Sequence, residues 1–133
     1  MNLNGRLICE FGAAGNVAAI CGAFGDELHA LGLHYQVPFF FPETTAYQQL
    51  LEKHGFEVTD ILAYDRPTIL QGGMQGLGNW SNNFFESDLS CLSDTQQEMV
   101  IAHMADHLQD KLWVDDHWEA DYRRLRVVAR KIN

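Results

Sequence analysis

The residues that could do chemistry begin with a glycine loop between an apolar run and a helical pattern. Leu7–Phe11 is followed by Gly12-Ala-Ala-Gly15, and Asn16 precedes apolar residues at helical spacing. A glycine loop that leads from a strand into a helix can bind a nucleotide phosphate, because backbone N–H groups point at the ligand. The spacing here is G-x-x-G, however, and residues 33–38 contain no carboxylate that could bind a ribose. We interpret the loop as a tight turn at the carboxyl end of a strand.

A pair of histidines is the second candidate. His103 and His107 lie four residues apart, next to Asp106 and Asp110, and two imidazoles on one helix face can bind a metal ion. The sequence contains no H-E-x-x-H motif, and no third ligand can be placed from it. Histidines at the edge of an apolar stripe are usually packing residues, so we predict no metal site.

Candidate nucleophiles are few. Cys9, Cys21 and Cys91 are three separate cysteines without a C-x-x-C pair, which favours reduced thiols in a cytoplasmic protein. Cys9 falls inside the apolar strand pattern, which suits an inert core thiol better than a nucleophile. No G-x-S-x-G motif is present, and we predict no particular catalytic residue.

Length and charge limit the possible partners. The 133 residues predict one domain, residues 1–133, and 47% hydrophobic content is ordinary for a globular chain. Nine Lys and Arg against 18 Asp and Glu give a net charge of −9, which argues against binding to nucleic acid or to a membrane surface. The arginines clustered between Arg123 and Arg130 are expected to pair with carboxylates. No secretory signal and no apolar run of about 20 residues is visible.

Apolar periodicity predicts the elements that position these residues. Leu7–Phe11 is a short and nearly continuous apolar run, which is typical of a strand covered on both faces. A helix then runs from Val17 to Leu31, with Asn16 as its N-cap and Gly32 as its stop.

The middle of the chain continues the alternation of elements. Pro38–Pro42 (PFFFP) predicts an extended linker whose phenylalanines fill a core. A helix is predicted from Thr44 or Thr45 to His54, and Phe56–Tyr64 reads as a strand.

The last part of the chain carries a helix and a strand. Gln71–Gly78 predicts a loop, and Ser93–Gln96 has the form of a capping box that opens a helix ending near Leu112. Trp118–Ala129 is predicted as the last strand, but its apolar residues change parity. A one-residue bulge near Arg123–Arg124 would bring them to one face. The element order predicts an open α/β sheet.

Several motifs, in this order and spacing, resemble a known family. They are GRLICEFGAAGN, then PFFFP with Y-x-x-L-L-E-x-x-G-F-E-V, DRPT, G-L-x-N-W and a closing DYRRLRVVARK. Together they resemble the C-terminal half of class I S-adenosylmethionine-dependent methyltransferases, in the branch close to trans-aconitate methyltransferase. The resemblance runs from Asn4 to Lys131.

The resemblance implies a fold. It implies a partial Rossmann-like α/β sheet of three strands in the order 5-7-6, with the last strand antiparallel and helices flanking the sheet. Leu7–Phe11 would be strand 5, Phe56–Tyr64 strand 6 and Trp118–Ala129 strand 7.

The resemblance also implies a function. The family's cofactor loop follows strand 1 and its ribose-binding acid ends strand 2, so we expect a methyltransferase-like protein that is not active alone and binds no cofactor by itself. Substrate would contact Glu10, Phe11 and Asn16 at the end of strand 5, and Trp80 in the helical cap. Two alternatives are a subunit of a split methyltransferase completed by a separate cofactor-binding chain, and a small-molecule binding module.

Strand 5 would be an edge strand in such a half-sheet. An apolar edge with unpaired backbone groups is prone to association unless it is covered. We therefore expect a homodimer formed through the strand edge Leu7–Phe11.

Overall fold

The computed structural model describes residues 2–133 and separates them into two units by their internal contacts. The first unit comprises the chain up to Asn16, Phe39–Arg66 and Tyr122–Asn133. The second comprises Val17–Pro38 and Pro67–Asp121. The single domain predicted for residues 1–133 stays a prediction.

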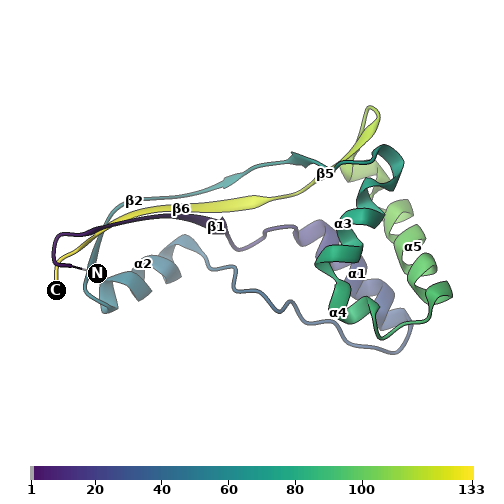
Figure 1. Cartoon of the computed structure of the whole chain (residues 1–133), viewed down its shortest axis with the longest axis horizontal. Coiled ribbons are helices and arrows are strands. Elements are labelled where there is room, and N and C mark those ends of the chain that lie inside the picture. The colour runs from purple at the N-terminus through teal and green to yellow at the C-terminus, as the bar shows by residue number, and fades with distance from the viewer. Residues whose placement is uncertain (1) are drawn as a thin grey trace. The chain divides into compact units, whose positions relative to one another are not determined.

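A three-stranded sheet forms the first unit (Figure 1). Its strands are β1 (Arg6–Gly12), β2 (Phe56–Asp65) and β6 (Arg123–Lys131). The order is β1-β6-β2, and β6 is antiparallel to both neighbours, so β1 and β2 run parallel to each other. This confirms the order 5-7-6 with an antiparallel last strand.

One face of this sheet packs against α2 (Thr44–Lys53), which ends before Gly55 at φ 86. The buried core of this face is Ala13, Leu51, Leu125, Val127 and Ala129. Alternate residues of β1 and β2 pack against that core, as the period of two along a strand requires.

The opposite face of the sheet is charged. Cross-strand ion pairs join Arg126 to Asp60 at 3.0 Å and Arg130 to Glu57 at 3.3 Å. The expected pairing of arginines with carboxylates is therefore confirmed at these positions. The expectation that β1 is covered on both faces is wrong within the described chain, since Ile8 on this charged face is 67% exposed.

Helices dominate the second unit. They are α1 (Ala18–Ala30), η1 (Gly73–Gln75), α3 (Gly76–Phe84), α4 (Glu86–Leu89) and α5 (Asp94–Leu112). A small antiparallel sheet has the order β3-β5-β4, from β3 (Thr68–Ile69), β4 (Trp113–Val114) and β5 (His117–Ala120). The predicted loop 71–78 is thus partly helical.

The buried core of this unit draws residues from α1, α3, α4 and α5, and from Phe85 between α3 and α4. Phe24 of α1 stacks on Phe85 at 3.9 Å between ring centroids, and both rings are buried.

The capping box of α5 is confirmed, because Ser93 and Gln96 each accept a backbone N–H from the other. Among the helices of residues 2–133, none combines the length and apolar character that crossing a bilayer requires.

The predicted start of α1 is wrong. Val17, not Asn16, occupies the N-cap position, with φ 47 and no side-chain cap from its own position. Asp121 caps the helix instead, since its carbonyl accepts the Val17 N–H at 2.9 Å and its carboxylate accepts the Ala19 N–H at 2.8 Å. Burial raises the pKa of the Asp121 carboxyl above its ordinary value, against the effect of the Ala19 N–H.

The predicted last strand is in fact two strands. β5 ends at Ala120 and β6 begins at Arg123, so the change of parity falls at the interruption and not at a bulge near Arg123–Arg124. Asp121, which caps α1, lies at this interruption. The register shift of the sheet lies in β2, between Val58 and Asp60.

The phenylalanines of the proline-bounded linker differ in their surroundings. Phe39 is 47% and Phe40 is 68% exposed, so the expectation that these rings fill a core is wrong for both. Phe41 alone packs inward, against the backbone at Gly12.

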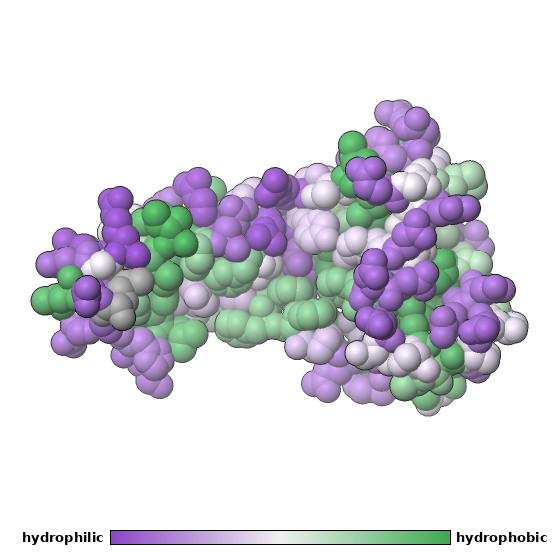
Figure 2. Space-filling view, in the orientation of Figure 1, coloured by the Kyte–Doolittle hydropathy of each residue, from purple (hydrophilic) through white to green (hydrophobic). Residues whose placement is uncertain are grey.

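Figure 2 shows several separate hydrophobic areas on the surface, with hydrophilic side chains between them.

Candidate functional site

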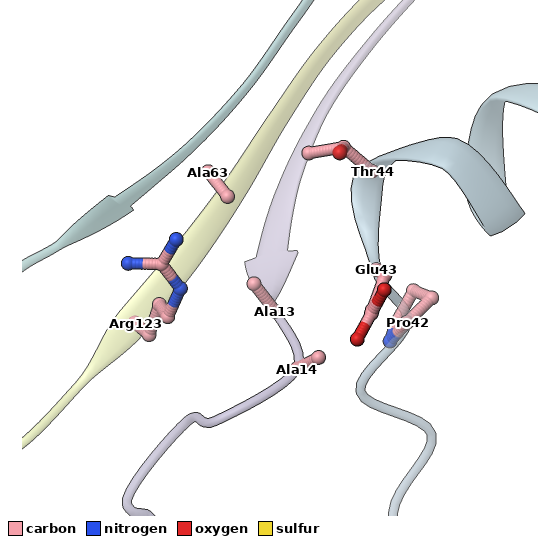
Figure 3. A pocket seen from close by; sticks show the side chains of 7 residues that line it. All are labelled: Ala13, Ala14, Pro42, Glu43, Thr44, Ala63 and Arg123. Carbon is pink, nitrogen blue, oxygen red and sulfur yellow. The ribbon is translucent and has the colours of Figure 1, made fainter.

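A small cavity lies in the first unit, where β1 ends. Its volume is about 230 Å³. The lining residues are Ala13, Ala14, Pro42, Glu43, Thr44, Ala63 and Arg123 (Figure 3). Ligands of open α/β sheets bind outside the carboxyl ends of the parallel strands, and β1 and β2 are such a parallel pair. The position of this cavity therefore makes it the candidate site.

Backbone hydrogen bonds hold the loop after β1, which lines the cavity with Ala13 and Ala14. The Ala13 N–H donates to the Arg123 carbonyl at 2.9 Å, which continues the ladder between β1 and β6. The Ala14 N–H donates to the Pro42 carbonyl at 2.9 Å. The loop after β1 is thus held on one side by β6 and on the other by the segment that leads into α2.

Asn16 positions the arginine of the site. It is only 7% exposed, and its Oδ1 accepts the backbone N–H of Arg123 at 2.7 Å. A buried amide of this kind satisfies a backbone donor that the ladder leaves free. Asn16 does not line the cavity itself, but it fixes the backbone of Arg123, which does.

Charge and hydrogen-bonding groups surround the cavity. Arg123 directs Nη1 to the Asp65 carboxylate at 2.8 Å, and its side chain is 37% exposed. Glu43 and Thr44 lie at the N-terminus of α2, where backbone N–H groups and the helix dipole favour negative charge. The alanines contribute small apolar walls. The arrangement suits a small polar molecule with both donor and acceptor groups.

The glycine loop is not open toward a ligand at its first residue. A Cβ on Gly12 would lie 2.7 Å from the Phe41 ring and 2.8 Å from the Asn16 amide nitrogen. The space that a glycine leaves is therefore filled by the chain's own side chains. The cavity is also smaller than the ~300–1,000 Å³ of pockets that hold drug-sized ligands.

Glu10 and Phe11 point to opposite faces of the sheet, and neither lines the cavity. Glu10 accepts a hydrogen bond from the Tyr64 hydroxyl and pairs with Arg124 at 3.6 Å. The Tyr64 hydroxyl, followed by Arg124, lowers the pKa of Glu10, and the same hydrogen bond raises the pKa of Tyr64. Phe11 packs edge to face on Tyr47 of α2, at 4.8 Å between ring centroids.

Trp80 belongs to the second unit. It is half-buried in α3 and stacks on Phe84 at 4.4 Å between ring centroids. Its edge-to-face contact with Phe85 at 6.0 Å joins it to the aromatic core of that unit. Of the four residues predicted to bind substrate, the structure places only Asn16 directly behind the candidate cavity.

Sequence reasoning missed Glu43, Thr44 and the individual role of Arg123. Thr44 carried one signal, as a candidate first residue of a helix. Arg123 was part of an arginine cluster, and no sequence pattern distinguishes it from Arg124 or Arg126. Its place depends on the register between β1 and β6, which pairs strands more than 100 positions apart.

The histidine pair meets a carboxylate of α1. His103 Nδ1 lies 3.3 Å and His107 Nε2 lies 3.7 Å from the oxygens of Glu27. Within residues 2–133, no group of three or more His, Cys, Asp or Glu side chains is arranged to hold a metal ion. We interpret the three side chains as a contact between α1 and α5.

Comparisons with known proteins agree with the motifs. No protein-family model matches the chain. An uncharacterized methyltransferase of Schizosaccharomyces pombe is 28% identical over 137 residues, which cover 98% of this chain and 51% of that protein. The chain is thus similar over nearly its whole length to part of a methyltransferase, and the resemblance predicted from the motifs is confirmed.

A solved structure shows the same fold. It is a protein of Bacillus halodurans C-125 assigned to the methyltransferases, with a TM-score of 0.53 and 14% identity. The match covers 100% of this chain and 54% of that protein. The chain spans about half the length of both relatives, and the likeness places its fold in the mixed α/β class of that structure.

Proposed function

We propose that this chain is the substrate-side half of an S-adenosylmethionine-dependent methyltransferase and is not active alone. The strand order β1-β6-β2 with an antiparallel β6 carries the proposal, because it matches the second half of the family's sheet. The similarity to about half of each relative supports it. The cavity at the end of β1 would receive the methyl acceptor.

The acceptor is a small polar molecule. Arg123 would bind a negative or acceptor group, and Thr44 and the N-terminus of α2 add donors on the other side of the cavity. Asn16 supports the site through Arg123. Glu10, Phe11 and Trp80 do not line this cavity, and their contact with substrate stays a prediction from the family resemblance. Most methyl-transfer catalysis is positioning, so no single catalytic residue is required.

We propose further that the chain does not bind S-adenosylmethionine by itself. The filled space at Gly12 and the small cavity volume support this. The cofactor, when bound by a complete enzyme, supplies the electrophilic methyl group. A cofactor-binding half, on this chain or on a separate one, would be needed for activity.

The chain is proposed to act in the cytoplasm as a homodimer that pairs through β1. The free thiols of Cys9, Cys21 and Cys91 support a reducing compartment. The outer edge of β1, which no strand of the described chain covers, supports association.

Calorimetric titration with S-adenosylmethionine tests the proposed function. We expect no binding heat from the 133-residue chain at micromolar to submillimolar cofactor. The variant Arg123→Ala is the matched control, because it removes the only cation that lines the cavity within the described residues. Micromolar binding by the unaltered chain would overturn the proposal, and loss of that binding in Arg123→Ala would place the cofactor in the cavity.

A further inference from the structure

β1 has one edge paired with β6 and one edge that pairs with no strand of residues 2–133. In an antiparallel pair, every second residue exchanges backbone hydrogen bonds with the partner strand, and the residues between point their N–H and C=O groups away. The Ala13 N–H donates to the Arg123 carbonyl, so the odd-numbered residues of β1 face β6. The backbone groups of Arg6, Ile8 and Glu10 therefore point outward.

The other edge of the sheet, on β2, is protected against pairing. Its register shifts between Val58 and Asp60, and it carries three acidic side chains at Glu57, Asp60 and Asp65. Bulges and charged side chains are devices that keep edges from associating. β1, in contrast, pairs with β6 in unbroken register over seven residues and carries one basic and one acidic side chain. It is the edge suited to a partner strand.

Two side chains of β1 are poorly matched within the chain. Arg6 lies opposite Arg130, which is already paired with Glu57 at 3.3 Å, and Arg6 forms no ion pair among the described residues. Ile8 is a large apolar side chain with 67% exposure. The hydrogen bond and the ion pairs of Glu10 all involve its Oε1 atom, so its Oε2 atom can accept a hydrogen bond from another cationic side chain.

We propose that two copies pair antiparallel through β1, with the two-fold axis at Ile8. This register rests on the proposed homodimer and specifies how its copies meet. Arg6 then lies opposite the partner's Glu10, once on each side of the axis, and Ile8 lies opposite the partner's Ile8. A two-fold axis at Arg6 or at Glu10 would place like charges opposite each other. An axis at Leu7 or at Cys9 would place Ile8 opposite a charged side chain.

This register uses the edge fully. Residues 6, 8 and 10 all point their backbone groups outward, so each of the three residue pairs can exchange two hydrogen bonds. The two three-stranded sheets become one sheet of six strands. Gly12 aligns with the partner's Asn4, which brings the partner's N-terminal turn beside the loop of the candidate site.

Reversing the charges of Arg6 and Glu10 tests the proposed register between the two β1 strands. In sedimentation velocity at high micromolar concentration, we expect a dimer for the unaltered chain. Arg6→Glu alone and Glu10→Lys alone each place like charges opposite in both pairs, and should weaken dimerisation about tenfold or more. An equimolar mixture of the two variants restores opposite charges in every pair and should dimerise. Lys53→Glu, an exposed charge reversal at the end of α2, is the control and should leave the dimer intact.

A backbone variant guards against a folding defect. Ile8→Pro removes an outward N–H and no hydrogen bond to β6, and proline is tolerated on edge strands. It should abolish the dimer while circular dichroism shows an unchanged sheet. An unaltered chain that is monomeric overturns both the homodimer and its register. A dimer that survives Ile8→Pro, or variants that fail to complement each other, overturns the register and leaves the homodimer of the proposed function standing. Neither result bears on the cofactor titration.

Discussion

At the scale of single residues, Gly12 and Asn16 determine how the segments around the candidate site pack. Asn16 binds the Arg123 backbone, and the Phe41 ring occupies the space that a side chain on Gly12 would take. Both residues belong to the loop that first suggested a phosphate site. In the structure they serve packing and positioning, and Arg123 is the positively charged residue among those that line the cavity.

Gly12→Ala tests this close packing. The new methyl group would overlap the Phe41 ring and the Asn16 amide, so we expect a loss of about 1–3 kcal/mol in the free energy of unfolding. Gly22→Ala is the matched control. A Cβ there meets nothing within 4 Å in the middle of α1, so this change should stabilise by up to about 1 kcal/mol. Urea unfolding followed by circular dichroism measures both, and equal effects would contradict the packing argument.

At the scale of elements, the two long helices of the second unit begin in different ways. α5 caps itself locally through the reciprocal bonds of Ser93 and Gln96. α1 has no local cap, and Asp121, which lies about 100 positions away in the chain, accepts its first N–H groups. The start of α5 was therefore visible in the sequence, and the start of α1 was misplaced.

Ser93→Ala tests the local cap of α5. Loss of the side-chain acceptor leaves the Gln96 N–H without its partner, and we expect a loss of about 1 kcal/mol in the free energy of unfolding. Tryptophan fluorescence in urea is a suitable measurement, because Trp113 and Trp118 follow this helix. Thr95→Ala, an exposed change in the same turn, should shift the midpoint little. Similar shifts for the two variants would argue against a cap.

At the scale of the whole molecule, neither unit is a continuous stretch of chain. The chain passes between the units four times, after Asn16, Pro38, Arg66 and Asp121. Unfolding one unit therefore releases the ends of the segments that build the other. This connectivity favours the predicted single domain as the unit of unfolding.

Leu125→Ala tests that cooperativity. Leu125 is fully buried in the core of the first unit, and its truncation should cost about 2–5 kcal/mol. All three tryptophans lie in the second unit, so their fluorescence reports on that unit alone. We expect their urea midpoint to fall along with the loss of sheet signal. Leu62→Ala, at a half-exposed position of β2, is the matched control with a small effect. An unchanged tryptophan midpoint in Leu125→Ala would show two domains.

The sequence by itself determined the strands near residues 7–11 and 56–64, the stops at Gly32 and Gly55, the cap at Ser93 and the resemblance to half a methyltransferase. These features depend on residues close together in the chain, where apolar period, glycine at positive φ and capping chemistry act locally. Only the tertiary structure decided that Asp121 caps α1, that Phe41 fills the space at Gly12 and that Arg123 faces the cavity. Each of these contacts joins segments far apart in the chain, and strand register selects which side chains meet.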